Sequence, residues 1–145
     1  PKHLILRTSW VFSEYGTNFL QTMQRLSKER DRISVVHDQF GGPTYARDLA
    51  NALIKIITHY QTNKYLKWGI YHYCGLPFTS WFELAQEIFQ HLKPSPTLIP
   101  ISTTEYGNTV NRPYNSRLDC TKINKAFGIE PSNWKLAIQK LCRLE

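Results

Sequence analysis

The chain has 145 residues, which fits one domain of typical size with its own core. Hydrophobic residues make up 41% and charged residues 20% of it, a composition that excludes a disordered chain. Lys and Arg number 18 against 11 Asp and Glu, but the charges are scattered, so the net charge of +7 fits a small anionic ligand as well as a nucleic acid.

No apolar run approaches the roughly 20 residues of a membrane-spanning helix, and the N-terminus lacks the pattern of a signal peptide. We therefore expect a cytoplasmic protein with no membrane partner. Its cysteines, Cys74, Cys120 and Cys142, are odd in number and form no CxxC pair. This spacing predicts reduced, structural thiols, without a disulfide framework or a cysteine zinc site, and the scattered histidines predict no metal site either.

The opening stretch, LILRTSWVF at residues 4–12, predicts a buried strand with polar residues where it ends. Leu4 to Leu6 are apolar, and Arg7-Thr8-Ser9-Trp10 follow them. In parallel α/β sheets, ligands bind just beyond the carboxyl ends of the strands, so these residues are site candidates. The alternative is an ordinary strand end whose hydroxyl groups cap the next turn.

Helices and short strands alternate along the next part of the chain. Phe19, Met23 and Leu26 lie at helical spacing, and residues 33–36 predict a short strand. A glycine-containing loop follows at 37–43, and Thr44 is expected to cap a helix running to about Tyr60. The residues expected to face inward from this helix are Leu49, Leu53, Ile56 and Ile57.

The second half of the chain continues this alternation. Residues 69–73 and 97–101 predict strands, and Thr79 or Ser80 is expected to cap a helix that ends near Leu92. Ser102 and Glu105 have the spacing of a capping box. A loop at 112–119 precedes two short helices, at about 121–127 and 132–143. Single strands between helices predict an α/β fold built from crossover units.

The motifs of a complete nucleotide-dependent enzyme are absent. The seven glycines form neither a GxGxxG dinucleotide loop nor a P-loop. Tyr60 and Lys64 match the YxxxK acid–base pair of short-chain dehydrogenases, but they lie where a helix runs into a linker, so we assign them no catalytic role. Because a core-type strand begins within three residues of Pro1, we expect the chain to be part of a longer protein.

Five motifs, taken together and in order, are specific. They are RTSWVF at 7–12, a Gly-x-Asn-Phe at 16–19, DQFGGPTYARDLA at 38–50, GIYHYCG at 69–75 and RPYNSRLD at 112–119. This series resembles the C-terminal, substrate-binding part of the dTDP-4-dehydrorhamnose reductases, which are extended short-chain dehydrogenases. The resemblance covers nearly all 145 residues.

The resemblance implies a single α/β substrate-binding domain over residues 1–145, with residues 1–12 as the last part of a Rossmann sheet. The family reduces dTDP-4-keto-L-rhamnose to dTDP-L-rhamnose, a precursor of surface polysaccharide, with NADPH or NADH. Its glycine-rich cofactor loop and its true YxxxK lie in an N-terminal Rossmann half, which would be this chain's partner. The chain alone is therefore expected to hold no catalytic residue and to be inactive.

The resemblance also implies site residues. Trp10, Asn18, Gln39 and Arg112 are expected to bind the dTDP-linked deoxysugar, and Thr8 and Ser9 to lie near the nicotinamide end of the cofactor. Two of these have a structural alternative. Asn18 would also serve as a helix cap, and Arg112 could form a salt bridge to Asp119 or Glu105.

A rival interpretation is a non-catalytic relative such as the regulatory β subunit of methionine adenosyltransferase, which binds a partner protein. Intact RTSW and DQFGGPT motifs favour the reductase. A module that binds nucleic acid is less well supported, because no platform of basic and aromatic residues is visible. Strand 4–12 would expose apolar edges without its Rossmann neighbours, so we expect the isolated chain to self-associate, for example as a homodimer, or to cover this strand.

Overall fold

Six helices and eight short strands alternate along the part of the chain that the structure describes. The structure is a computed structural model, and it describes residues 2–107 and 112–143. In chain order the elements are β1 (Leu4–Arg7), β2 (Val11–Phe12), α1 (Phe19–Glu29), β3 (Arg32–Val36), β4 (Phe40–Gly41), β5 (Thr44–Tyr45), α2 (Ala46–Asn63), β6 (Gly69–His72), β7 (Thr79–Ser80), α3 (Trp81–Phe89), β8 (Thr97–Ile101), α4 (Thr103–Tyr106), α5 (Thr121–Phe127) and α6 (Trp134–Cys142).

The strands pair over long stretches of sequence. β1 pairs with β6, β2 with β5 and β3 with β8, all in parallel, whereas β4 and β7 pair antiparallel. Each parallel pair is joined by a connection that contains at least one helix. Parallel strands need such crossovers, so the predicted α/β class is confirmed.

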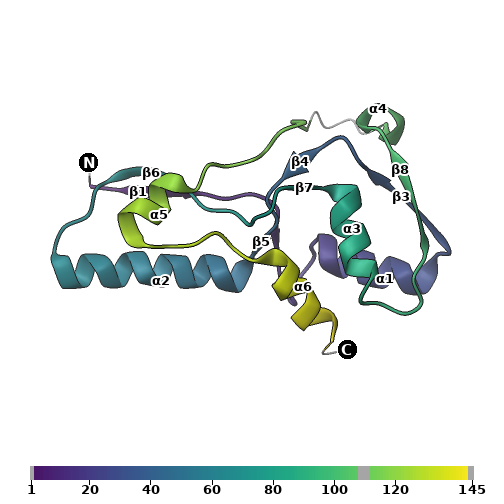
Figure 1. Ribbon diagram of the computed structural model, residues 1–145, viewed down its shortest axis with the longest axis horizontal. Helices are drawn as coiled ribbons and strands as arrows, with labels where there is room; N and C mark the ends of the chain where they lie inside the picture. Colours follow the sequence, from purple (N-terminus) through teal and green to yellow (C-terminus); the bar gives the residue numbers. More distant parts are fainter. Residues whose placement is uncertain (1, 108–111, 144–145) are drawn as a thin grey trace.

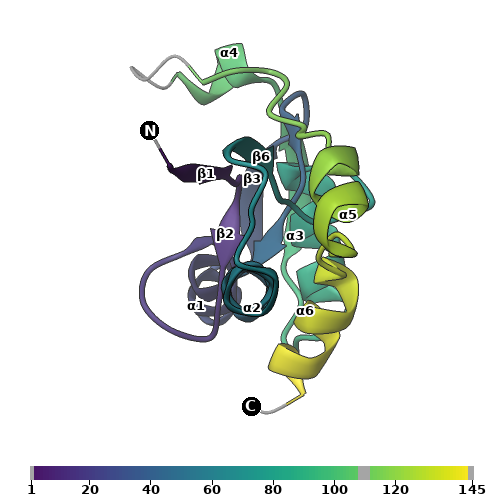
Figure 2. The ribbon, with the colours of Figure 1, turned by 90° about the vertical axis from the view of Figure 1, so that its left-hand side faces the viewer.

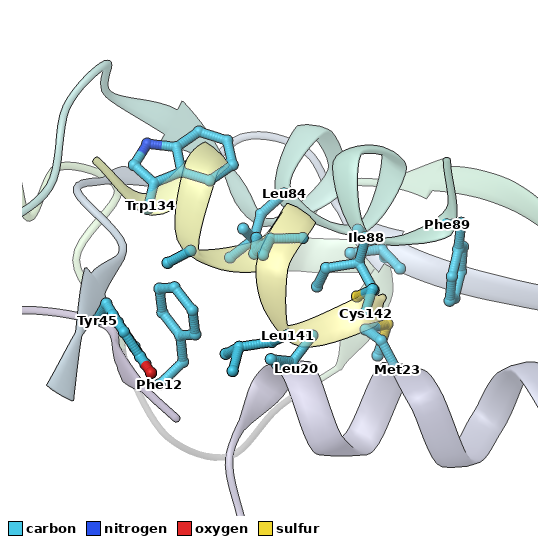
Figure 3. Close-up of a cluster of buried hydrophobic side chains, with 14 of the residues drawn as sticks. Phe12, Leu20, Met23, Tyr45, Leu84, Ile88, Phe89, Trp134, Leu141 and Cys142 are labelled. Carbon is cyan, nitrogen blue, oxygen red and sulfur yellow. The ribbon is translucent and has the colours of Figure 1, made fainter. Parts of the chain in front are cut away.

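Two hydrophobic clusters divide the elongated molecule (Figure 1). One lies among α1, α3 and α6, beside the β3–β8 pair, and its largest fully buried side chain is Trp134 (Figure 3). The other lies among α2, α5 and β6 at the opposite end, around Tyr71 and Ile123. Residues 8–18, which include β2, and the segment from β4 to β5 connect the two ends.

The opening strand is shorter than the sequence predicts. Trp10 has φ 48°, in the left-handed region, so the backbone turns between β1 and β2. A continuous strand over 4–12 is therefore wrong. Each half finds its own parallel partner, β6 for β1 and β5 for β2.

The predicted caps of α3 and α4 are confirmed, and the predicted cap of α2 is wrong. Ser80 and Glu83 form a capping box at the start of α3, and Ser102 and Glu105 form another at the start of α4. Thr44 does not cap α2, because it is a buried residue of β5 whose hydroxyl group binds the backbone. The N-cap of α2 is Tyr45, which makes no side-chain capping bond.

Helix α2 also differs from its prediction. It extends to Asn63, and its buried residues are Ala52 and Ile56, whereas Leu53 and Ile57 are 41% and 56% exposed. The inward orientation expected for Leu53 and Ile57 is therefore wrong. Figure 2 views α2 end-on and shows α5 and α6 on one side of it, so only part of its apolar surface meets another element.

Two apolar surfaces remain open as a result. The first, here called the α2 face, consists of Leu53, Ile54 and Ile57. The second consists of Ile5 and Ile70, which are register partners on the outer side of the β1–β6 pair and are 45% and 41% exposed. In the described part of the chain, no helix is both long and apolar enough to cross a membrane.

Candidate functional site

Two of the sequence motifs interlock at the carboxyl end of β1. The Thr8 hydroxyl donates a hydrogen bond to Thr44 Oγ1 at 3.4 Å, and the Ser9 hydroxyl donates to the Gly42 carbonyl at 3.1 Å. Thr44 in turn donates its hydroxyl to the Ser9 carbonyl at 2.7 Å. These bonds fix the RTSW turn against the GGPT loop, which gives the small polar residues of both motifs a structural purpose.

Trp10 forms one end of an aromatic stack whose centre is Trp81. Its ring lies 3.7 Å from that of Trp81, centroid to centroid, with an interplanar angle of 11°. Phe19 packs on Trp81, with the centroids 4.7 Å apart. On the other side, a Cβ at Gly41 would come within 2.5 Å of Trp10 Cε2, closer than atoms can pack. Only glycine therefore lets the indole lie against this backbone.

A cavity of about 630 Å³ lies beside this stack. Its apolar lining comes from α1, β3 and Trp81, and three guanidinium groups, those of Arg30, Arg32 and Arg112, surround it. The polar lining is completed by Thr22, Ser34, Gln39, Thr103 and Tyr106. Arginines around an aromatic and apolar floor suit an anionic ligand that carries a flat ring, because guanidinium groups bind phosphate oxygens and an indole stacks on rings.

A hydrogen-bonded chain holds the edge of this cavity. Thr103 donates its backbone N–H (3.0 Å) and its hydroxyl (2.6 Å) to Asp38 Oδ1, and the Gln39 amide donates to Thr103 Oγ1 at 3.1 Å. Partial burial raises the pKa of Asp38, but the bonds from Thr103, together with smaller contributions from the Asp38 backbone and from His37, outweigh that effect and lower the pKa below its usual value. Asp38 is thus an ionised anchor that orients Thr103 and, through it, Gln39.

The structure brings some of the predicted site residues together. Gln39 and Arg112 both line the cavity, and Trp10 contacts it through Trp81. Within the described residues, Arg112 forms no ion pair with Asp119 or Glu105; Glu105 accepts from Ser102 and Asp119 from Thr121. The salt-bridge alternative for Arg112 is therefore not what the structure shows.

Asn18, Thr8 and Ser9 lie elsewhere. Asn18 is the N-cap of α1, where its side-chain oxygen accepts from the Gln21 N–H and its amide donates to the Ser13 and Tyr15 carbonyls. Its capping role is thus present, and its role in substrate binding stays a prediction. Thr8 and Ser9 brace the GGPT loop, and their place near a cofactor also stays a prediction.

Three lining residues escaped the sequence analysis. Arg30 and Arg32 belong to an alternating charge run that resembles a solvated helix end, but the chain turns there from α1 into β3 and presents both to the cavity. Trp81 follows Ser80 at the start of a helix, and from the sequence alone it is indistinguishable from a core residue. One signal in the sequence could have identified Arg30 and Arg32. The pattern changes from helix to strand at Asp31, which places these two residues at the start of a strand instead of along a helix.

Other chemistry is not supported by the described residues. Nowhere in residues 2–107 and 112–143 do three or more His, Cys, Asp or Glu side chains gather as metal ligands would. Tyr60 and Lys64 lie at the end of α2, where Lys64 is the C-cap and Tyr60 packs edge-on against Trp68. This position agrees with leaving the YxxxK match without a catalytic role.

Comparison with known sequences identifies similar proteins. The sequence matches the family described as the RmlD substrate binding domain over residues 1–144. A dTDP-4-dehydrorhamnose reductase of Aggregatibacter actinomycetemcomitans is 47% identical over 147 aligned positions, which cover 97% of this chain and 50% of that protein. The chain thus spans about half the length of the curated relatives that it matches.

Solved structures give the same result. The crystal structure of dTDP-4-dehydrorhamnose reductase from Bacillus anthracis in complex with NADP is similar with a TM-score of 0.82 and 35% identity, over 97% of this chain and 48% of that one. The orthologue from Clostridium acetobutylicum has a TM-score of 0.86 and 31% identity, over the same shares. The predicted resemblance and fold class are therefore confirmed.

Proposed function

The chain belongs to the RmlD substrate-binding domain family, and on that premise we propose that residues 1–145 form the sugar-nucleotide-binding part of a dTDP-4-dehydrorhamnose reductase. In this proposal residues 1–12 are the last part of a Rossmann sheet whose other strands lie in a cofactor-binding half. The observation that carries the proposal is the cavity that combines Arg30, Arg32 and Arg112 with Trp81.

The lining residues have distinct roles in this account. The three guanidinium groups neutralise the diphosphate, with Arg112 binding two of its oxygens at once. The Trp81 indole offers a flat wall for a ring of the ligand, with Trp10 stacked behind it. Gln39, held by Thr103, presents its amide to a base edge or a sugar hydroxyl. Outside the cavity lining, Asn18 would contribute as the N-cap of α1, where the helix dipole favours phosphate.

The chain's residues fit only the margin of a cofactor site. The glycine-rich loop that would hold a pyrophosphate is absent, whereas the hydroxyl groups of Thr8 and Ser9 lie at the carboxyl end of β1 and keep lone pairs free to accept hydrogen bonds. NADPH or NADH, bound mainly by the other half, would supply a hydride for the 4-keto group of the sugar. The role of this chain is to bind and orient the sugar nucleotide.

The exposed apolar surfaces support a partner of this kind. Leu53, Ile54 and Ile57 on α2 and Ile5 and Ile70 on the β1–β6 pair are side chains that a further layer of structure would bury. We assign these surfaces to the cofactor-binding half. The chain alone is expected to show no reductase activity, because neither the cofactor loop nor the acid–base pair is within its sequence.

A calorimetric titration of the chain with dTDP-rhamnose, and separately with dTDP, tests the proposal. Arg112→Gln is expected to weaken binding of both ligands by about tenfold or more, since a hydrogen bond to a charged group contributes about 1.5–3 kcal/mol. Arg25→Gln is the matched control, because Arg25 is an exposed α1 residue paired with Glu29.

The alternative results are equally informative. Equal affinities for the Arg112→Gln and Arg25→Gln variants would show that the cavity is not the binding site of the sugar nucleotide. Absence of binding to the unmodified chain would contradict the proposal and favour a non-catalytic relative that binds a partner protein.

A further inference from the structure

Two cysteines far apart in sequence lie in contact next to the GGPT loop. Cys74 follows β6 and Cys120 precedes α5, and their sulfur atoms are 3.7 Å apart. The backbone N–H of Cys74 donates to Cys120 Sγ at 3.3 Å. Both are reduced thiols in the structure, as the sequence predicts. Neither takes part in the sugar-nucleotide cavity.

The two thiols differ in access. Cys74 is fully buried, whereas Cys120 is 7% exposed and lines a second cavity of about 620 Å³. The charged lining residues of this cavity are Arg117, Lys125, Asp119 and Glu130, so its two cations are balanced by two carboxylates. Because Cys120 lines a cavity and Cys74 is fully buried, an oxidant can reach Cys120 before Cys74.

The surroundings also activate Cys120. Contact with the Cys74 thiol, together with the hydrogen bond that the Cys74 N–H donates to Cys120 Sγ, outweighs the effect of burial and lowers the pKa of Cys120. The same contact raises the pKa of Cys74. The thiolate is the reactive form of cysteine, so Cys120 has the character of an attacking thiol and Cys74 that of a resolving one.

We propose that Cys74 and Cys120 form an oxidisable pair that closes into a disulfide when the chain meets a small-molecule disulfide such as oxidised glutathione. Cys120 sulfur attacks one sulfur of the reagent, the S–S bond of the reagent breaks, and a mixed disulfide forms as one thiolate leaves. Cys74 sulfur then attacks Cys120 sulfur, the S–S bond of the mixed disulfide breaks, and the proton of Cys74 passes to the second thiolate as it leaves. Two protein thiols are oxidised and one small disulfide is reduced to two thiols.

Closure of this disulfide involves the site loop. The sulfur atoms would move from 3.7 Å to about 2.05 Å apart. Cys74 Sγ packs directly on Gly42, where an added Cβ would lie 2.8 Å from it. At the adjacent Gly75, an added Cβ would lie still closer to the loop, 1.8 Å from the Pro43 carbonyl oxygen. The oxidised pair would thus form a covalent link between the β6 exit and the start of α5, immediately beneath the loop that Gln39 precedes.

Peptide mapping by mass spectrometry tests the proposal. The folded chain is treated with oxidised glutathione, quenched with acid, denatured, alkylated and digested. We expect one cross-linked peptide pair that joins Cys74 to Cys120, lighter by two hydrogen atoms than the sum of the reduced peptides and lost on treatment with dithiothreitol. Cys142 is expected to take no part in the link and to be alkylated after denaturation. A Cys142→Ser chain should form the same link.

Single variants separate the two roles. Cys74→Ser is expected to trap a glutathione adduct on Cys120, whereas Cys120→Ser should leave Cys74 unmodified; circular dichroism checks that each variant is folded. Three alkylated cysteines in the treated wild-type chain would overturn the proposal. A link through Cys142, or a glutathione adduct on Cys74 in the Cys120→Ser variant, would do the same.

Discussion

At the scale of single residues, the site depends on close contacts that only particular side chains allow. Trp10 in a left-handed conformation stacks on Trp81, and Gly41 leaves room for the indole. Trp81 thereby gains a fixed place in the wall of the arginine-lined cavity. RTSW and GGP are therefore parts of one packing arrangement, which explains why the two motifs occur together in the sequence.

Gly41→Ala tests this arrangement. The new methyl group would meet Trp10 Cε2 at 2.5 Å and Ser116 Oγ at 2.9 Å, so the indole must shift. We expect a loss of about 1–3 kcal/mol in the free energy of unfolding and a weaker near-ultraviolet circular dichroism signal from the Trp10–Trp81 pair. Gly16→Ala, where the Cβ meets open space but φ is 69°, should cost about 1–2 kcal/mol and leave that signal intact. An unchanged spectrum in Gly41→Ala would contradict the account.

Asp38 gives the site a dependence on pH. Because its folded pKa is lowered, its contribution to stability is fully present above its unfolded pKa, about 3.9, and is lost as the pH falls through the folded pKa. The difference in free energy of unfolding between the wild type and Asp38→Asn should stay constant from pH 7 to about 5 and shrink below about 4. Urea unfolding at each pH measures it. A difference that is the same at pH 3 and pH 7 would show that the Thr103 bonds do not stabilise the ionised form.

At the scale of elements, helix starts with a side-chain cap form where the sequence indicates them. Ser80 accepts from the Glu83 N–H, and Glu83 accepts from the Ser80 N–H at 2.8 Å, which lowers the pKa of Glu83. Helix α3 buries Leu84, Ala85, Ile88 and Phe89 in the cluster with α1 and α6. Its start is thus coupled to the core.

Ser80→Ala is therefore expected to lower the free energy of unfolding by about 1 kcal/mol. Ser102→Ala removes an equivalent capping box from α4, a four-residue helix with no buried side chain. Loss of this capping box should fray only α4 and have a smaller effect on the free energy of global unfolding. Chemical denaturation of both variants compares them, and equal losses would show that α3 is not stabilised through its cap.

The elements also show where prediction from sequence reaches its limit. Helical spacing, capping boxes and the glycine loop indicated most elements, because these signals act within a few residues. Other features depend on parts of the fold that are distant in sequence. The turn at Trp10 depends on its stacking with Trp81, and the strand role of Thr44 depends on its hydrogen bond to Ser9. The outward side of α2 carries Leu53 and Ile57, which no other element covers. Arg30 and Arg32 were overlooked for the same reason, since only the folded chain brings them to Arg112.

At the scale of the whole molecule, two clusters share one chain and leave apolar surface open. The cluster around Trp134 is enclosed by α1, α3 and α6, whereas the cluster around Tyr71 has β1 and α2 at its outer side. The side chains of Ile54 and Ile57 are 60% and 56% exposed. In the absence of another half to cover it, we expect a second copy of the chain to cover the α2 face.

Sedimentation velocity tests this expectation. The chain should self-associate as its concentration rises, and the double variant Ile54→Lys, Ile57→Lys should remain monomeric, because two ammonium groups cannot be buried in an apolar contact. Leu136→Lys is the control, since Leu136 is 45% exposed on α6 but lies outside the α2 face. A monomeric wild-type chain at all concentrations, or continued association of the double variant, would contradict the expectation.

The central claim is that the cavity beside Trp81 binds the sugar nucleotide, and the indole N–H signals of the four tryptophans in an NMR titration test it most directly. With dTDP-rhamnose we expect the Trp81 signal to shift strongly and the Trp10 signal to follow through the stack. The Trp134 signal should stay in place, because its N–H donates to the Pro77 carbonyl within the core. Shifts confined to Trp68 or Trp134, or no shift of Trp81 at saturating ligand, would contradict the claim.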